Sequence, residues 1–234
     1  MRYQGGKSRI AKLIVSAIER ERERESNQTF VSLFCGSCSV ESKVKGYNKI
    51  ICNDKHEYLI EMLKGVQDGY DLPEIISEEQ YKYIREHKDE DKILTGFVGF
   101  GCSFGGKFFG GYARNKTGTN YAAQSKRSLL KDMATLTTAE FLCLDYRDVI
   151  IPDGSIVYAD PPYANTTTYQ GQKFNSKEFW EYMRKVAKNN QVFISEQVAP
   201  DDFTCIWEKP LTRTLDRNKE NQFKVVEKLF TYKI

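Results

Sequence analysis

The sequence lacks any long hydrophobic run. No apolar stretch in the 234 residues approaches the roughly 20 residues that a membrane-spanning helix needs. The first seven residues also lack the apolar core of a secretory signal, so we expect a cytoplasmic protein with no membrane segment. Hydrophobic residues make up 40% of the chain and charged residues 29%, which is enough for one sizeable core with a smaller inserted subdomain.

Histidine is scarce, and this limits the metal sites that the chain can build. The only two histidines, His56 and His87, form no ligand pair to complement the C-x-x-C spacing of Cys35 and Cys38. Most of the six cysteines stand in apolar stretches, where free thiols behave as small hydrophobic side chains. We therefore expect no metal and no disulfide framework. Metal or redox use of the C-x-x-C pair is the alternative.

Acidic residues are missing from residues 92–131. The same stretch contains seven basic residues, so within a total charge of +3 the rest of the chain sums to −4. A basic block inside a mildly acidic chain indicates contact with a polyanion. The candidates for this contact are Lys107, Arg114, Lys116, Lys126 and Arg127.

Short apolar runs alternate with helical patterns through most of the chain. Strands are predicted at residues 29–34, 48–52, 139–144, 155–159 and 191–195. Helices are predicted from about Ser8, at residues 56–66 and at residues 176–188, with a short helical stretch after residue 39. This alternation predicts an α/β fold with a parallel sheet. Residues 203–208 and 223–232 are predicted to form an antiparallel pair near the end of the chain.

The alternation stops between residues 65 and 140. Polar, helix-like sequence at residues 77–92 leads into a glycine- and aromatic-rich segment at residues 96–112. We predict that residues 68–138 form an inserted, partly helical subdomain, and that residues 1–67 and 139–234 form the main domain. A glycine-rich surface loop is the alternative for this segment.

The strongest motif is Asp160-Pro161-Pro162-Tyr163, directly after a predicted strand. Ligands of open α/β sheets bind beyond the carboxyl ends of the strands. Two prolines fix φ and provide no N–H, so they hold the Asp160 carboxylate and the Pro161 carbonyl in defined directions. These two acceptors could take both hydrogens of an exocyclic amine, leaving its lone pair aimed at an electrophile, while Tyr163 stacks on the base. The alternative is a strand that ends in a proline turn.

A turn of small residues follows the first predicted strand and includes Gly36, Ser37, Cys38 and Ser39, directly after Phe34. Small side chains let the backbone approach a cofactor closely, and the free N–H groups of a helix start can bind a carboxylate.

Two carboxylates and an N-terminal loop complete the candidate site. Asp54 follows the second strand about 20 residues after the turn, where acidic residues of nucleoside-binding folds grip ribose hydroxyls. Asp145 ends another strand and could accept a hydrogen bond from an adenine. Both could equally be ordinary surface carboxylates. The loop with Tyr3, Gly6 and Lys7 is typical of anion binding, but it lacks the spacing of a nucleotide P-loop.

Together these motifs resemble the Dam-like, alpha-type adenine-specific DNA methyltransferases, which include many phage enzymes. Residues 3–7 are similar to the family's [YW]-x-G-G-K motif, residues 34–39 resemble its F-x-G-x-G-[ST] turn, and residues 160–163 match its catalytic D-P-P-Y. The order of these motifs along the chain is also that of the alpha type. One departure is Cys38, which stands where the second glycine is usual.

The resemblance implies a Rossmann-like sheet that binds S-adenosylmethionine and methylates the N6 amino group of a flipped adenine in double-stranded DNA. It implies that residues 68–138 form the target-recognition subdomain and that residues 164–173 close over the base. It places the target base at Asp160, Pro161, Pro162 and Tyr163. It places cofactor contacts at Tyr3, Gly6, Lys7, Phe34, Gly36, Ser37, Cys38, Ser39, Asp54, Asp145 and Asp160.

Two other functions stay open at this point. One is an amino methyltransferase acting on ribosomal RNA, since some guanine-N2 enzymes carry D-P-P-Y. The other is a catalytically inactive DNA-binding module. A monomer is favoured, and membership of a restriction–modification system or of a phage's self-protection is left open.

Overall fold

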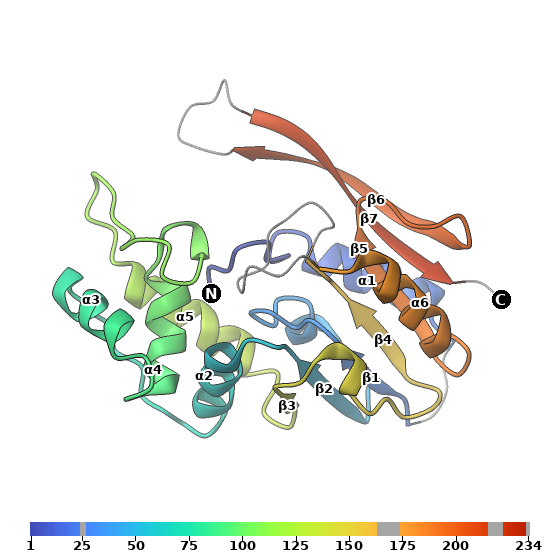
Figure 1. Ribbon diagram of the computed structural model, residues 1–234, viewed down its shortest axis with the longest axis horizontal. Coiled ribbons are helices and arrows are strands. Elements are labelled where there is room, and N and C mark those ends of the chain that lie inside the picture. The colour runs from blue at the N-terminus through green and yellow to red at the C-terminus, as the bar shows by residue number, and fades with distance from the viewer. Residues whose placement is uncertain (24–26, 163–173, 215–221, 233–234) are drawn as a thin grey trace.

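A seven-stranded sheet organises the chain (Figure 1). The computed structural model describes residues 1–23, 27–162, 174–214 and 222–232. In chain order the strands are β1 (Thr29–Ser32), β2 (Lys49–Asn53), β3 (Glu140–Leu142), β4 (Ile156–Ala159), β5 (Gln191–Glu196), β6 (Phe203–Thr214) and β7 (Gln222–Tyr232). The helices are α1 (Ala11–Glu21), α2 (Glu57–Gln67), α3 (Glu78–Glu86), α4 (Lys92–Gly96), α5 (Tyr121–Met133) and α6 (Ser176–Val186).

The strand order is β3-β2-β1-β4-β5-β7-β6. The first five strands of this order are parallel, which confirms the predicted α/β sheet. Strand β7 runs antiparallel to both β5 and β6, which confirms the predicted C-terminal pair. Because chain order reverses between β1 and β4, the carboxyl ends of these two strands flank the crevice where ligands of such sheets bind.

Successive side chains of each strand enter opposite layers of the core. Phe30, Ile156 and Phe193 pack with α1 on one face, whereas their neighbours Val31, Val157 and Ile194 pack with α6 on the other. Strands β1, β4 and β5 are therefore buried on both faces, which explains why each is a continuous apolar run in the sequence.

Helices α3, α4 and α5 form a lobe beside the sheet (Figure 1). This lobe contains the predicted insert, but its hydrophobic cluster also includes residues of α2 and of the turn after β1. Phe97, Phe100 and Leu129 of the insert share this cluster with Cys38 and Leu59. The lobe is thus packed firmly against the sheet, and its domain boundaries stay a prediction.

Some elements differ from their predicted bounds. The polar stretch at residues 77–92 is broken into α3 and α4, because the Asp91 side chain accepts a hydrogen bond from Leu94 N at 2.9 Å and caps a new helix. The predicted helical stretch after residue 39 is only a 3₁₀ turn at Glu41–Lys43. Strands β6 and β7 are much longer at the hairpin end than β5, which pairs only with residues 228–231.

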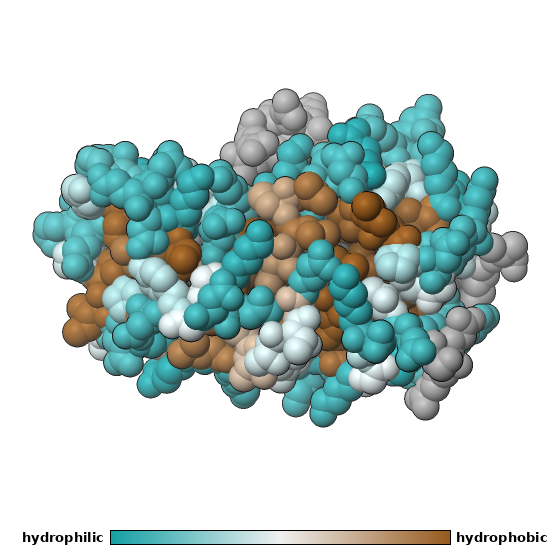
Figure 2. All heavy atoms as spheres, turned by 90° about the horizontal axis from the view of Figure 1, so that it is seen from below, coloured by the Kyte–Doolittle hydropathy of each residue, from teal (hydrophilic) through white to brown (hydrophobic). Residues whose placement is uncertain are grey.

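The face seen in Figure 2 is mostly hydrophilic, with hydrophobic residues gathered near its centre. Within the described part of the chain, none of the helices combines the length and the apolar character that crossing a bilayer requires.

Candidate active site

Asn53 ties together the carboxyl ends of the strands on one side of the crevice. Its amide nitrogen donates to Leu33 O at 3.0 Å and to Leu144 O at 3.1 Å, and its amide oxygen accepts from Leu144 N at 3.0 Å. The side chain is 1% exposed. The segments after β1 and β3 are therefore held on either side of the end of β2. Sequence reasoning missed Asn53, although its place directly before Asp54 was a signal.

The turn after β1 contains two residues in the left-handed conformation. Gly36 has φ 49° and Cys38 has φ 55°, and Cys38 N donates to Cys35 O at 2.9 Å. A left-handed conformation costs a non-glycine residue about 1–2 kcal/mol. Cys38 is fully buried and packs in the hydrophobic cluster with Cys35 and Cys52, which holds it in this conformation. The chain therefore takes a left-handed turn at Cys38 without a glycine.

Gly36 lies directly beneath the ring of Tyr3. A Cβ atom at Gly36 would come within 2.9 Å of Tyr3 Cε1. On its other side the Tyr3 ring packs against Phe100, with ring centroids 5.1 Å apart. The N-terminal loop and the turn after β1, both predicted as cofactor-binding segments, are therefore in contact.

Replacing Gly36 by alanine is expected to lower the free energy of unfolding by about 1–2 kcal/mol for the left-handed backbone alone. A further loss is expected from the clash with Tyr3, together with weaker cofactor binding. Chemical denaturation measures the loss of stability, and calorimetric titration measures the loss of cofactor affinity. Gly118→Ala is the control, because Gly118 has φ 66° but nothing within 4 Å of its added Cβ. Equal losses in the two variants would contradict a role for the contact with Tyr3.

Asp54 is half-buried at the end of β2 and organises the turn. Its carboxylate accepts hydrogen bonds from Gly36 N and His56 N, both at 3.0 Å. Burial nevertheless raises the pKa of Asp54 to about 6, because the two backbone bonds only partly offset the loss of water. A half-buried carboxylate of this kind is suited to accept hydrogen bonds from hydroxyl groups of a ligand.

Cofactor affinity is expected to fall as pH drops below about 6. Ionised Asp54 is predicted to accept hydrogen bonds from both ribose hydroxyls, whereas protonation at its raised pKa would remove an acceptor. The dissociation constant should rise by up to about tenfold per pH unit below that pKa and stay flat above it. Calorimetric titration from about pH 5 to about pH 8 measures this dependence of the dissociation constant on pH. Asp54→Asn should bind weakly with no such dependence, and a wild-type affinity independent of pH would contradict the assignment.

Asp145 sits after β3 in a pair of ion bridges. Arg147 Nε lies 2.8 Å from its Oδ1, and Lys55 Nζ lies 3.2 Å from its Oδ2. The hydrogen bonds from Arg147 lower the pKa of Asp145 to about 2, so this carboxylate stays ionised across the working range. An adenine amine bound there would share its oxygens with Arg147 and Lys55.

Asp160 directly follows β4 and forms an ion pair with Lys7 of the N-terminal loop. Lys7 Nζ lies 2.9 Å from Asp160 Oδ1 and 3.4 Å from Glu227 Oε2 of β7. The side chains of Lys7 and Glu227 are 4% and 2% exposed, and that of Asp160 is 19% exposed. The structure thus brings Lys7 and Asp160 together and adds Glu227, a residue that sequence reasoning placed in the closing strand without assigning it to the site.

A cavity of about 720 Å³ opens beside this cluster. Tyr3, Gly6, Lys7 and Ser39 line it, and so does Glu227. Asp54 and Asp160 are not among its lining residues. Ser37 contributes through a hydrogen bond between its hydroxyl and that of Ser39, at 3.2 Å. Four of the predicted cofactor residues therefore share one cavity.

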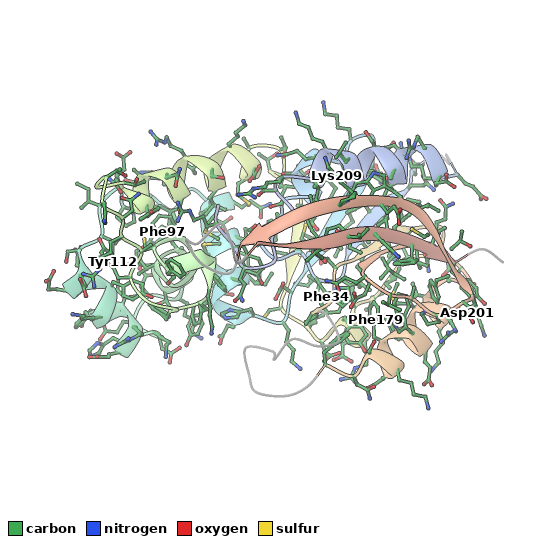
Figure 3. All side chains as sticks on the ribbon, turned by 90° about the horizontal axis from the view of Figure 1, so that it is seen from above. Phe34, Phe97, Tyr112, Phe179, Asp201 and Lys209 are labelled. Carbon is green, nitrogen blue, oxygen red and sulfur yellow. The ribbon has the colours of Figure 1, made fainter. Side chains whose placement is uncertain are left out.

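Phe34 stands at the start of the turn within a group of aromatic rings. Its ring centroid lies 5.3 Å from that of Tyr146 and 6.0 Å from those of Phe174 and Phe179. Figure 3 shows Phe34 and Phe179 close together, far from Phe97 and Tyr112 in the lobe of α3–α5. This packing fixes the turn against α6.

The basic candidates of the insert fall into two groups. Lys107, Lys116 and Arg127 are exposed, and Arg114 is 74% exposed although it pairs with Glu78. Lys126 instead pairs with two acidic residues, Asp71 at 2.9 Å and Glu74 at 3.9 Å. A second cavity of about 530 Å³ is lined by Arg114 and Lys116 together with Arg2, Phe104 and Tyr121.

Some predicted residues cannot be placed. Tyr163 and the predicted closing segment at residues 164–173 lie outside the described residues, whereas Pro161 is buried and Pro162 half-buried. All six cysteines are free thiols. Across residues 1–23, 27–162, 174–214 and 222–232, no three His, Cys, Asp or Glu side chains are grouped to hold a metal ion.

The strand order, the small-residue turn after β1 and the carboxylates at the ends of β2 and β4 define a Rossmann-like methyltransferase fold. The chain matches the D12 class N6 adenine-specific DNA methyltransferases over residues 3–94 and 102–202. It belongs to this family. The resemblance inferred from the motifs is confirmed, and the chain is an adenine-specific DNA methyltransferase by class.

Solved structures of similar shape include a proposed RNA methyltransferase from Pyrococcus horikoshii, with 9% identity, a TM-score of 0.46, and coverage of 96% of this chain and 81% of that one. The rRNA methyltransferase aviRa from Streptomyces viridochromogenes has 14% identity and a TM-score of 0.44, with 94% and 84% of the two chains covered. The tRNA (m1A58) methyltransferase TrmI from Aquifex aeolicus has 11% identity and a TM-score of 0.40, with 97% and 68% covered.

Proposed function

We propose that this chain transfers a methyl group from S-adenosylmethionine to the N6 amino group of a flipped adenine in double-stranded DNA. The observation that carries the proposal is the Asp160 carboxylate. It lies at the carboxyl end of β4, held by Lys7, next to the strand that leads into the Gly36 turn and its Asp54. A carboxylate beside a turn suited to a nucleoside cofactor supports methyl transfer to an amine bound there.

The residues of the turn fit the proposed cofactor. Asp54 offers a half-buried carboxylate to the ribose hydroxyls, and the absence of a side chain at Gly36 lets Tyr3 approach the backbone closely. Asp145 offers a permanently charged acceptor to the adenine. When bound, S-adenosylmethionine supplies a methyl group activated by a positive sulfonium.

The protein's own contribution is to orient the target amine. The Asp160 carboxylate and the Pro161 carbonyl accept its two hydrogens, which turns the nitrogen lone pair toward the methyl group. Holding the nitrogen in line with the bond between the sulfonium sulfur and the methyl group speeds the reaction, because the two reactants are already aligned. As the N–C bond formed and the sulfur–methyl bond broke, positive charge would build on the nitrogen and the Asp160 carboxylate would stabilise it. S-adenosylhomocysteine would then leave and one proton would pass to solvent.

The basic face of residues 68–138 is assigned to DNA. Exposed Lys107, Arg114, Lys116 and Arg127 are suited to phosphate contacts, which fix the duplex without reading its sequence. Lys126, which already pairs with Asp71 and Glu74, is the weakest of the predicted contacts.

The deciding experiment is incubation of the purified protein with methyl-labelled S-adenosylmethionine and genomic DNA, followed by mapping of the modified bases. Label is expected on adenine N6 within one short recognised sequence. Ribosomal RNA is offered in parallel. Label on RNA alone, or on a base other than adenine in DNA, would contradict the proposal.

A further inference from the structure

A buried ion cluster connects three distant parts of the chain. Lys7 belongs to the N-terminal loop, Asp160 follows β4, and Glu227 lies in β7. Lys7 Nζ contacts both carboxylates, and the Lys7 and Glu227 side chains are almost fully buried. Burying charges is costly unless they are paired, so this arrangement constrains all three side chains.

The backbone on both sides of the cluster is fixed. The carbonyl of Lys7 accepts hydrogen bonds from Ile10 N and Ala11 N, each at 2.8 Å, so Lys7 is anchored to the start of α1. Glu227 lies next to Lys228, which is in register with Glu196 of the neighbouring strand β5. Lys7 and Glu227 are thus placed by rigid elements and not by loops that adjust freely.

We propose that Glu227 is a positioning residue for methyl transfer, which holds the Lys7 ammonium in place and thereby orients the Asp160 carboxylate toward the target amine. The proposal rests on the proposed function, since it takes Asp160 as the acceptor of the amine. Glu227 acts through Lys7, and no direct contact with the base is assigned to it.

The charge of the cluster gives a second reason for Glu227. One ammonium and two carboxylates carry one positive and two negative charges, a net charge of −1 when all are ionised. A pair of Lys7 and Asp160 alone would be neutral. Because Lys7 is shared between two carboxylates, it holds Asp160 in place without fully neutralising it, so the Asp160 carboxylate can still stabilise the nitrogen as it becomes positive.

The test begins with Glu227→Gln, which keeps the shape of the side chain and removes its charge. We expect kcat to fall by at least about tenfold, because a preorganised electrostatic contact to the reacting group is weakened. The dissociation constant of S-adenosylmethionine is expected to change by a smaller factor than kcat. Glu227→Asp, which keeps the charge on a side chain one methylene shorter, should recover part of the lost kcat.

A double-mutant cycle with Lys7→Met separates positioning from general damage. If Glu227 acts through Lys7, Glu227→Gln should have little further effect on kcat in the Lys7→Met background. Thr231→Val is the matched control, because Thr231 is buried in the same strand and donates a hydrogen bond to Val192 O at 2.9 Å. It should lower the melting temperature without lowering kcat.

The outcomes distinguish the two proposals. Wild-type activity on adenine that needs Asp160 but is unchanged in Glu227→Gln would overturn the role of Glu227 and leave the proposed function intact. Additive losses in the cycle would also overturn it. A wild-type protein without adenine methylation would instead remove the proposed function.

Discussion

Asp160→Ala is expected to abolish methyl transfer while leaving cofactor binding largely intact. The carboxylate is assigned to the amine of the base, whereas Asp54 and the Gly36 turn are assigned to the cofactor. Removing one preorganised polar group from a reacting centre costs about 100-fold to 1,000-fold in kcat, and Asp160 is both acceptor and charge. We therefore expect a loss of at least that size in a labelled-methyl assay.

The same substitution leaves Lys7 with Glu227 as its remaining carboxylate partner in the cluster. The melting temperature must therefore be measured beside kcat. Asp160→Asn is the companion variant, because its amide keeps the side-chain volume and one acceptor oxygen but loses the charge. It should fold like the wild type and still transfer poorly. Full activity in Asp160→Ala would remove the proposed mechanism.

Replacing Lys107, Arg114 and Lys116 together by alanine is expected to weaken duplex binding and to reduce its salt dependence. Each lost phosphate contact lowers the slope of log Kd against log salt by about 0.9, so the triple variant should lose close to three units. Because phosphate contacts carry no sequence information, the loss should be similar for specific and non-specific duplexes. Fluorescence anisotropy at several salt concentrations measures both quantities.

The matched control for this triple variant removes the same charge from another part of the surface. Arg20 at the end of α1, and Lys185 and Lys188 at the end of α6, are exposed and lie outside the predicted insert. Their joint replacement by alanine should leave the slope nearly unchanged. An equal drop in both triple variants would show that overall charge, and not the insert, governs binding.

Much of the fold could be predicted because its signals are local. Strands buried on both faces are continuous apolar runs, and the five parallel strands were found within a few residues of their bounds. The broken helix at residues 77–92 was not predicted. Its break depends on the Asp91 cap, which competes with continuation of a helical pattern that the sequence also supports.

The candidate site was predictable only where a motif carries its own geometry. The D-P-P-Y motif directed attention to Asp160 because prolines restrict the backbone wherever they occur. Glu227 carries no such local signal, and the signal of Asn53 is limited to its place directly before Asp54. Asn53 hydrogen-bonds with partners 20 and 91 residues away along the chain. Glu227 pairs with Lys7, which lies near the opposite end of the chain.

The sequence by itself determined the strands, the family and the residue types of the chemistry, since these follow from periodicity and from short motifs. Only the tertiary structure decided that Lys7 faces two carboxylates, that Cys38 takes a left-handed turn, and that Lys126 pairs with acidic neighbours. The physical reason is that ion pairs and buried contacts depend on distances in space. The order of the strands in the sheet sets these distances, and the spacing of residues along the chain does not.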